Sequence, residues 1–392
     1  MISVAEAQEL ALGLVRPLPS EIVHLPQAAG RYMAHPATAQ RDQPPFAASA
    51  MDGYATCGAA GPGAVFTVVG QAAAGHAWGG TLTSGQALRI FTGAPVPNGA
   101  DRVIIQEDVT RSGDRITVSP HVGDGLNIRP QGQDFRSGDR LSQRLLRPTD
   151  LALLASMNVP DLPVTRRPVI AIIATGDELV MPGESPRDDQ IIASNSFALS
   201  AMAEAAGATA RLLPIARDTE PSLRAVFALA LDADLIVTIG GASVGDHDLV
   251  GKVAADLGME RAFYKIAMRP GKPLMAGRIK DVPMLGLPGN PVSSVVCGHL
   301  FMLPMIRAML GDPLPAPRLA RARLAASVPA NGPRAHYMRA TVTQGEDGPR
   351  ILGFDRQDSA LLSVLADANA LLLRPPGDVA RAAGDLVDYL PI

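Results

Sequence analysis

The sequence has only two cysteines, Cys57 and Cys297, which lie far apart and form no CxxC pair. A disulfide framework and a cysteine-ligated zinc site are therefore not expected. The N-terminus also lacks the basic and apolar segments of a secretory signal peptide, and Glu6 and Glu9 come early. These absences predict a protein of the reducing cytoplasm.

Long apolar runs and an excess of charge are also missing. The most hydrophobic stretch, Val295 to Leu310, is interrupted by His299, Pro304 and Arg307, so no membrane span is predicted. A net charge of −3 argues against a nucleic-acid-binding surface. Hydrophobic residues make up 47% and charged residues 19% of 392 residues, which is ordinary for a soluble chain of two or three domains. An anionic ligand would then be bound by local backbone dipoles and by a few basic side chains at specific positions.

Lysine is nearly absent. The four lysines, Lys252, Lys265, Lys272 and Lys280, all fall within one 29-residue window, although Lys and Arg together number 35. A compact ammonium group differs from a guanidinium fork at a phosphate or oxyanion site. Lys265 and Lys272 are therefore candidates for anion binding, whereas chance clustering on a solvated face suits Lys252 and Lys280.

The most informative stretch that is present runs from Asp234 to Asp248. Leu235 to Ile239 is a continuous apolar run, typical of a strand buried on both faces of a parallel sheet. The glycines that follow allow a sharp turn and a close approach of the backbone to an anion. An ordinary strand-to-helix turn is the alternative. The ligand candidates in this loop are Gly240, Gly241, Ser243, Gly245 and Asp248.

Strand and helix patterns alternate over residues 167–310, which predicts a doubly wound parallel sheet with helices on both faces. The expected strands are 169–174, 210–215, 235–239 and 282–287, and the expected helices are 194–206, 221–231, 250–257 and one from 292.

The remaining chain predicts three further parts of an α/β multidomain protein. Residues 1–42 and 135–166 form a split helical linker domain, in which helices near 3–14 and 148–157 pack together. Residues 43–134 hold short strands separated by Gly and Pro, typical of an inserted small β domain. Residues 311–392 follow a proline-rich linker and form a C-terminal β domain with a helix near 359–365.

Polar loops follow three strands of the predicted sheet: Thr175 to Glu178, Gly240 to Asp248, and Gly286 to Ser293. Since the carboxyl ends of parallel strands lie at one edge, these loops and Asp218 should face the same space. Neither GxxxxGK[ST] nor GxGxxG occurs. Carboxylates beside glycine-rich loops instead favour a phosphate bridged by Mg²⁺. The turn Met268 to Pro273 adds fixed positive charge, although any one of these carboxylates alone would usually be solvated.

The ordered motifs TGDEL, GGASVGDHD, RPGKP and LPGNPVS resemble those of the molybdopterin molybdenumtransferase family, which includes MoeA-type enzymes and the gephyrin E domain. The resemblance extends to SAMDGYA, FTGAPVP, NIRPQGQDF and SALLSVLADANALL, so it covers nearly the whole chain. It implies insertion of molybdate into adenylylated molybdopterin with release of AMP, and the Mg²⁺ predicted from the carboxylates would be the cofactor. It also implies a homodimer formed through the split domain, and transient contact with the adenylyltransferase or with molybdoenzymes.

Matched motif by motif, the resemblance implies seven catalytic positions, of which Asp52, Thr92 and Asp134 are expected to act across the dimer interface. The full set is Asp52, Thr92, Asp134, Glu178, Asp218, Asp248 and Lys272. We predict that three of these carboxylates hold Mg²⁺, namely Glu178, Asp218 and Asp248.

The resemblance also implies a substrate-binding set, part of which forms a molybdate pocket. Besides Gly240, Gly241, Ser243 and Gly245, the set contains Lys265, Arg269, Pro273, Pro288, Asn290, Pro291 and Ser293. The molybdate pocket is implied at Arg269, Lys272, Pro273 and Ser293, with Arg334 or Arg339 and Ser359 or Ser363 as weaker candidates from the tail.

The sequence departs from the family pattern at several positions, and two other functions stay open. Arg269 stands where lysine is common, and Gln133 stands where an acid is common. A molybdopterin adenylyltransferase is the nearest alternative, although it would lack the β insertion and the tail. A non-catalytic scaffold that binds pterin or nucleotide is the other, and the retained carboxylates speak against it.

Overall fold

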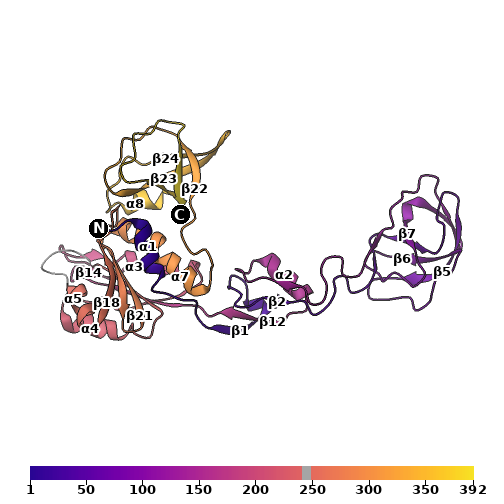
Figure 1. The fold of residues 1–392 in the computed structure, drawn as a ribbon, viewed down its shortest axis with the longest axis horizontal. Coiled ribbons are helices and arrows are strands. Elements are labelled where there is room, and N and C mark those ends of the chain that lie inside the picture. The colour runs from indigo at the N-terminus through magenta and orange to yellow at the C-terminus, as the bar shows by residue number, and fades with distance from the viewer. Residues whose placement is uncertain (241–248) are drawn as a thin grey trace. The chain divides into compact units, whose positions relative to one another are not determined.

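The computed structural model describes residues 1–240 and 249–392, which form two compact units (Figure 1). Unit 1 contains Met1–Glu21 and Thr165–Ile392, and unit 2 contains Ile22–Val164. Four predicted site residues, Gly241, Ser243, Gly245 and Asp248, lie outside the described residues.

A six-stranded sheet in the order β16-β13-β17-β21-β20-β18 forms the centre of unit 1. The first four strands are parallel, as predicted, because each is a short apolar run followed by a crossover. The last two are antiparallel and were not predicted. The parallel strands are β16 (Thr209–Leu212), β13 (Val169–Ala174), β17 (Leu235–Ile239) and β21 (Val282–Leu287), and the antiparallel ones are β20 (Met275–Ile279) and β18 (Met259–Tyr264).

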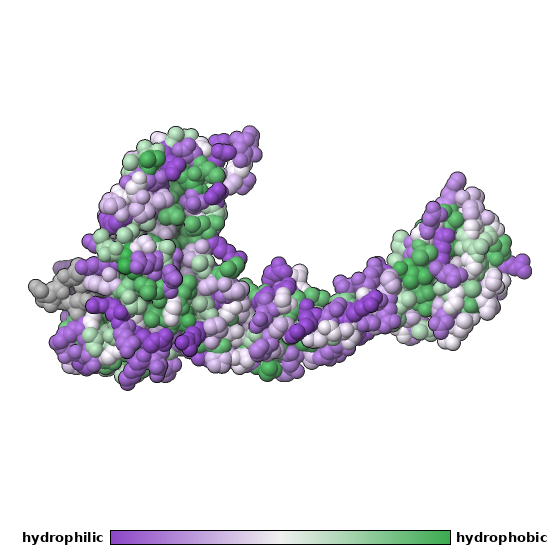
Figure 2. Space-filling view, in the orientation of Figure 1, coloured by the Kyte–Doolittle hydropathy of each residue, from purple (hydrophilic) through white to green (hydrophobic). Residues whose placement is uncertain are grey.

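Helices cover both faces of this sheet, which makes it doubly wound. On one face, α4 (Glu220–Ala228) and α5 (Leu249–Asp256) share a core with β13, where Phe227 and Val253 are fully buried. Their outer surface is hydrophilic (Figure 2), and Arg224 of α4 pairs with Asp256 of α5 at 2.7 Å. The helix α3 (Asn195–Ala205) packs against β13 and β16.

A long helical stretch in unit 1 runs through α6 (Pro291–Cys297), the π-helical segment η3 (Gly298–Met302) and α7 (Leu303–Leu310). By length and composition residues 291–310 could cross a membrane, but 72% of their most apolar window is buried, as in a core helix. Pro304 offers no N–H to the Leu300 carbonyl, and Gln8 of α1 (Val4–Leu12) donates to that oxygen at 3.0 Å. The side chain of Gln8 thereby fastens the N-terminal helix to this stretch.

The C-terminal part of unit 1 is a β-barrel, because a pairing between β23 and β25 closes the sheet order β23-β24-β22-β26-β25. The two-residue strand β19 (Met268–Arg269) joins it beside β23, so the RPGKP turn of the α/β domain is tied to the tail. The barrel elements are β22 (Ala320–Leu324), β23 (Ala335–Gly345), β24 (Gly348–Gly353), α8 (Leu362–Ala366), β25 (Ala370–Arg374) and β26 (Leu386–Pro391).

Unit 2 contains the predicted β insertion as a six-stranded sheet in the order β7-β4-β6-β5-β9-β8. Its strands are β4 (Gly53–Thr56), β5 (Val65–Ala72), β6 (Gln86–Ile90), β7 (Arg102–Ile105), β8 (Val109–Ser112) and β9 (Arg115–Val118). The rest of the unit has the helical segments η1 (Leu25–Gln27), η2 (Gln106–Asp108) and α2 (Pro148–Ser156). Short strand pairs are β1 (Ser20–His24) with β12 (Asp161–Thr165), β2 (Ala37–Thr38) with β11 (Arg140–Leu141), and β3 (Ala48–Ser49) with β10 (Ile128–Arg129).

The N-terminal helix and residues 148–157 belong to different units, whereas we predicted that the two helices pack together. Helix α1 belongs to unit 1, where its buried Ala7 and Ala11 allow it to pack closely against α7 and β18. Helix α2 belongs to unit 2, where it packs against η1. The boundaries of the four predicted domains stay a prediction.

Candidate functional site

The ends of β13, β17 and β21 meet at small residues. The backbone N–H of Thr175 donates to the Ile239 oxygen at 3.0 Å, and that of Gly240 donates to the Leu287 oxygen at 3.0 Å. A Cβ added to Gly240, where φ is +94°, would lie 2.9 Å from the Thr175 oxygen. Only glycine allows this approach, so the three loops after these strands begin side by side.

A hollow of about 710 Å³ lies at these strand ends. Its wall includes Asn195 and the apolar side chains of Ile191 and Ile192, which belong to the short strand β15 (Ile191–Ile192) paired with β14 (Leu179–Val180). Seven predicted site residues line it together: Glu178, Asp218, Gly240, Pro273, Pro288, Asn290 and Pro291. Four other described residues of the predicted catalytic and substrate-binding sets in unit 1 do not line it, namely Lys265, Arg269, Lys272 and Ser293, and neither do the weaker tail candidates.

Glu178 lies directly over the glycine of its own motif. A Cβ added to Gly176, where φ is +146°, would lie 2.4 Å from a Glu178 carboxylate oxygen. Arg217 then clamps this loop, because its Nη1 donates to the carbonyl oxygens of Gly176, Asp177 and Leu179 at 3.3, 3.1 and 2.9 Å. This role of Arg217 was not predicted, because its only signal in the sequence is an arginine directly before Asp218 at a strand end.

Asp218 and Asp177 bind each other's backbone. The Asp218 N–H donates to Asp177 Oδ1 at 3.1 Å, and the Asp177 N–H donates to Asp218 Oδ2 at 3.4 Å. Among residues 1–240 and 249–392, no group of three or more His, Cys, Asp or Glu side chains is arranged to hold a metal. Within the described part of the chain, Glu178 and Asp218 present two carboxylates to one hollow, and Mg²⁺ commonly takes one or two protein carboxylates when phosphate oxygens complete its shell.

Side chains from α3 and from the tail hold the LPGNPVS turn. Asn195 Nδ2 donates to the Gly289 oxygen at 2.7 Å, and Asn290 Nδ2 donates to Ser359 Oγ at 3.0 Å. The Val292 N–H also donates to the Ser359 oxygen at 3.1 Å. Of the two serine candidates in the tail, the structure therefore brings Ser359 to the rim of the hollow.

Arg339 is committed to the loop that carries Ser359. It is 1% exposed, and its guanidinium donates to Gln357 Oε1, to the Asp358 oxygen at 2.7 Å and to the Arg356 oxygen at 3.2 Å. Burial lowers the pKa of Arg339. In this structure its donors are used within the chain, so Arg339 is not a free anion ligand, whereas Arg334 makes no side-chain hydrogen bond with any described residue.

The RPGKP turn is tight. The Ile266 and Leu274 N–H groups both donate to the Lys272 carbonyl oxygen at 3.1 Å, while the Lys272 side chain is exposed. A Cβ added to Gly271, where φ is +107°, would lie 2.6 Å from Cys297 Sγ. The turn therefore needs glycine, and its backbone places Pro273 at the hollow.

In unit 2, Asp52 and Thr92, two of the positions given by the motif match, are in direct contact, which was not predicted. Asp52 Oδ1 accepts hydrogen bonds from both the backbone N–H and the hydroxyl of Thr92 at 2.7 Å. These bonds lower the pKa of Asp52. Arg89, which was not predicted as a site residue, lies over the Phe91 ring at 4.5 Å from its centroid and donates to the Gly53 oxygen at 3.0 Å. Arg89 therefore contacts both the SAMDGYA motif, through Gly53, and the FTGAPVP motif, through Phe91.

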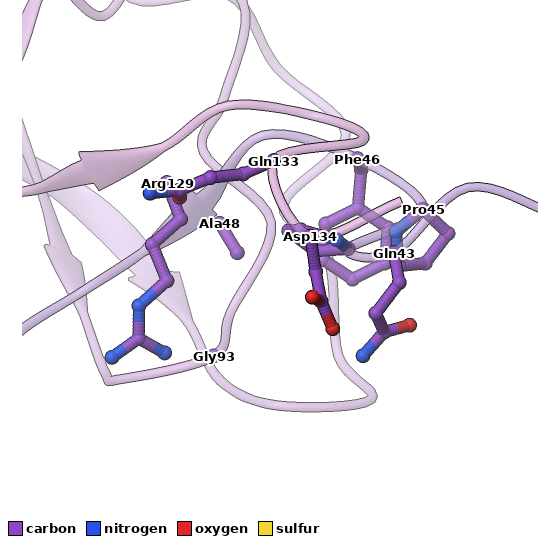
Figure 3. Close-up of a pocket in the computed structure, with 9 residues that line it drawn as sticks. Gln43, Pro45, Phe46, Ala48, Gly93, Arg129, Gln133 and Asp134 are labelled. Carbon is purple, nitrogen blue, oxygen red and sulfur yellow. The ribbon is translucent and has the colours of Figure 1, made fainter. Parts of the chain in front are cut away.

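A second hollow, of about 630 Å³, lies in unit 2 and contains Asp134. Figure 3 shows the Asp134 carboxylate, the Gln43 amide and the Arg129 guanidinium extending to the same side, with Gly93 close by. Phe46 supplies an aromatic ring, and the Asp134 N–H donates to the Gln43 oxygen at 2.9 Å. Arg129 and Phe46 were not predicted, because nothing local marks them as ligands.

Three known domains match the chain in order. Residues 2–158 match the MoeA N-terminal region (domain I and II), residues 171–308 match a domain described as "Probable molybdopterin binding domain", and residues 321–392 match the MoeA C-terminal region (domain IV).

Whole-length relatives agree with this order. A protein of Nostoc sp. named molybdopterin molybdenumtransferase is 34% identical, over 100% of this chain and 94% of its own length. A protein of Bacillus subtilis with the same name is 33% identical, over 95% of this chain and 90% of its own length. The crystal structure of the molybdopterin biosynthesis MoeA protein from Pyrococcus horikoshii OT3 is similar with a TM-score of 0.86 at 26% identity, covering 100% of both chains.

Proposed function

The chain belongs to the MoeA family of molybdopterin molybdenumtransferases, and on that premise we propose that it inserts molybdate into adenylylated molybdopterin and releases AMP. The observation that carries the proposal is the hollow at the ends of β13, β17 and β21. Two carboxylates, a glycine backbone and the LPGN turn face one space of about 710 Å³, which suits a substrate with a pterin and a nucleotide joined through phosphates.

The phosphate end of the substrate is assigned to the acidic side of the hollow. Glu178 and Asp218 would hold Mg²⁺ together with Asp248, which lies outside the described residues. Bound there, Mg²⁺ would neutralise the charge that develops on the leaving AMP phosphate. Gly240, which has no side chain, would let the pyrophosphate approach the backbone closely, and Gly241, Ser243 and Gly245, which lie outside the described residues, complete the proposed phosphate-binding set.

Molybdate is assigned to the RPGKP turn and its neighbours. Lys265, Arg269 and Lys272 provide positive charge, and Arg269 and Lys272 pair with no carboxylate among the described residues. Pro273 and Ser293 complete the pocket from the turn and from α6. Pro288, Asn290 and Pro291 form the wall against which the substrate is oriented, and Ser359 joins them from the tail.

The residues of unit 2 are assigned to proton handling across a homodimer. Asp52 and Asp134 would position water or ligand protons, a role typically worth about 10²–10⁴-fold in rate. Thr92 orients Asp52. In this proposal the second subunit supplies these three residues, the enzyme is cytoplasmic, and it contacts the adenylyltransferase or molybdoenzymes transiently.

Release of AMP separates the candidate functions. Purified protein with adenylylated molybdopterin, Mg²⁺ and molybdate should release AMP only when molybdate is present. An adenylyltransferase would instead consume ATP and molybdopterin, and a scaffold would do neither. The D218N variant should bind the substrate yet release AMP at least about 100-fold more slowly, because one metal-side charge is removed. Molybdate-independent AMP release by the wild type would refute the proposal.

A further inference from the structure

Glu178 and Asp218 reach the hollow from two different loops. Glu178 belongs to the loop after β13, and Asp218 belongs to the loop after β16. The two loops leave the sheet side by side, because the Gly176 N–H donates to the Ala216 oxygen at 3.1 Å. The distance between the two carboxylates therefore depends on the contacts that join one loop to the other.

Arg217 makes the largest of these contacts. Its neighbour Asp218 lines the hollow, whereas Arg217 itself does not. The Nη1 of Arg217 lies within hydrogen-bond distance of three carbonyl oxygens of the loop after β13, which belong to Gly176, Asp177 and Leu179. These three residues flank the glutamate on both sides, so the loop curves around the guanidinium.

The first turn of helix α4 fixes the backbone of Arg217. The Arg217 N–H donates to Ser222 Oγ at 2.9 Å, and the Ser222 N–H donates to Oγ1 of the N-cap residue Thr219 at 3.4 Å. In the described part of the chain, the guanidinium donates only to the three backbone oxygens. Its contacts therefore serve the shape of the neighbouring loop.

We propose that Arg217 is a positioning residue for the two carboxylates assigned to Mg²⁺, because it holds the loop of Glu178 at a fixed place beside Asp218. Asp177 supplies a second tie, since its N–H donates to Asp218 Oδ2 and its Oδ1 accepts from the Asp218 N–H. Residues that orient metal ligands without touching the metal are typically worth about 10–100-fold in metal affinity or activity. The proposal deepens the proposed function and rests on it for the roles of Glu178 and Asp218.

The test measures AMP release in the steady state and Mn²⁺ binding by electron paramagnetic resonance, with the full chain. R217M keeps much of the side-chain length but has no donor. We expect its kcat to fall about 10–100-fold, with the KM for adenylylated molybdopterin within about threefold of the wild type, because the carboxylates act on charge that develops as AMP leaves. Its Mn²⁺ affinity should fall about tenfold. An unchanged kcat, or a rise in KM alone, would overturn the proposal.

R217K separates positioning from a general loss of folding. The ammonium group keeps the charge and can donate to the same oxygens over a shorter reach, so kcat of R217K should exceed that of R217M at least about fivefold. An R217K variant as impaired as R217M would overturn the proposal, because the donors would then not matter.

The matched control is R224M. Arg224 lies on α4, and its only side-chain hydrogen bond within the described chain is to Asp256 at 2.7 Å, so R224M removes the same charge from the same domain. It should stay within about twofold of the wild type in kcat and in Mn²⁺ affinity. A loss in R224M equal to that in R217M would overturn the proposal, because charge alone would then explain both.

The Mn²⁺ titration keeps this inference distinct from the proposed function. A wild type that binds Mn²⁺ but releases no AMP would refute the proposed function, and weaker Mn²⁺ binding by R217M would still support the role of Arg217. Equal Mn²⁺ affinity of R217M and the wild type would overturn the inference even if the wild type releases AMP. A wild type that binds no Mn²⁺ would overturn it as well.

Discussion

The clearest quantitative prediction concerns Arg339 and the loop that it holds. Replacing Arg339 by Met keeps the length of the side chain but removes every donor to residues 356–361. The Asp358 oxygen, 2.7 Å from the guanidinium, and the Arg356 oxygen, at 3.2 Å, would each lose a charged donor. Gln357 Oε1 keeps the backbone N–H of residue 339 at 3.0 Å, so it stays bonded.

The bonds to the Asp358 and Arg356 oxygens, at about 1–2 kcal/mol each, together contribute about 2–4 kcal/mol, a range that allows for the favourable removal of a buried arginine that has no carboxylate partner. The longer bond from Arg339 to the Leu361 oxygen, at 3.4 Å, is left out of this sum. Since about 1.4 kcal/mol is a factor of ten, amide exchange in residues 354–361 should accelerate by roughly 30-fold to 900-fold in R339M. Hydrogen–deuterium exchange measures this locally, which suits a multidomain chain that need not unfold in two states.

The matched control is R321Q, since Arg321 is an exposed arginine of the same barrel that pairs with Asp388 at 3.0 Å. It should change exchange in residues 354–361 by less than about twofold. R339M should also raise the KM for the substrate, because the loop carries Ser359 to Asn290. Wild-type exchange rates in R339M would refute the role of Arg339 as the anchor of this loop.

Three further predictions follow from single contacts. G271A should lower the free energy of unfolding by about 1–3 kcal/mol, because its Cβ would lie 2.6 Å from Cys297 Sγ at a φ of +107°, whereas G61A, with open space around it, should be neutral in thermal unfolding. T92V should raise the pKa of Asp52 part-way toward its usual value, because only the backbone N–H donor remains; an unchanged pKa by ¹³C NMR would contradict this. Burial lowers the pKa of His336 in β23 to about 4, below the unfolded value near 6.5, so its contribution to stability is lost as pH falls from 6.5 to 4. The unfolding free energy of H336Q should fall less over that interval, and parallel pH profiles would refute the argument.

Local patterns were sufficient for much of the α/β domain. The predicted strands 169–174, 235–239 and 282–287 have the bounds of β13, β17 and β21, because each is a continuous apolar run closed by a turn. The strands β18 and β20 were missed, since Met259–Tyr264 carries charged residues and Met275–Ile279 contains a glycine. Both are strands because they pair with a neighbour, and that pairing is not local.

The sequence by itself determined the family, the parallel sheet and the acidic loops at the strand ends, because these depend on residue types at short spacing. Only the tertiary structure distinguished Arg334 from Arg339, placed Ser359 on Asn290 and brought Arg217 to the loop of Glu178. Arg334 and Arg339 look equivalent in the sequence, because they lie five residues apart on one segment. Burial and the direction of hydrogen bonds decide their roles, and both are properties of contacts between segments far apart in the chain.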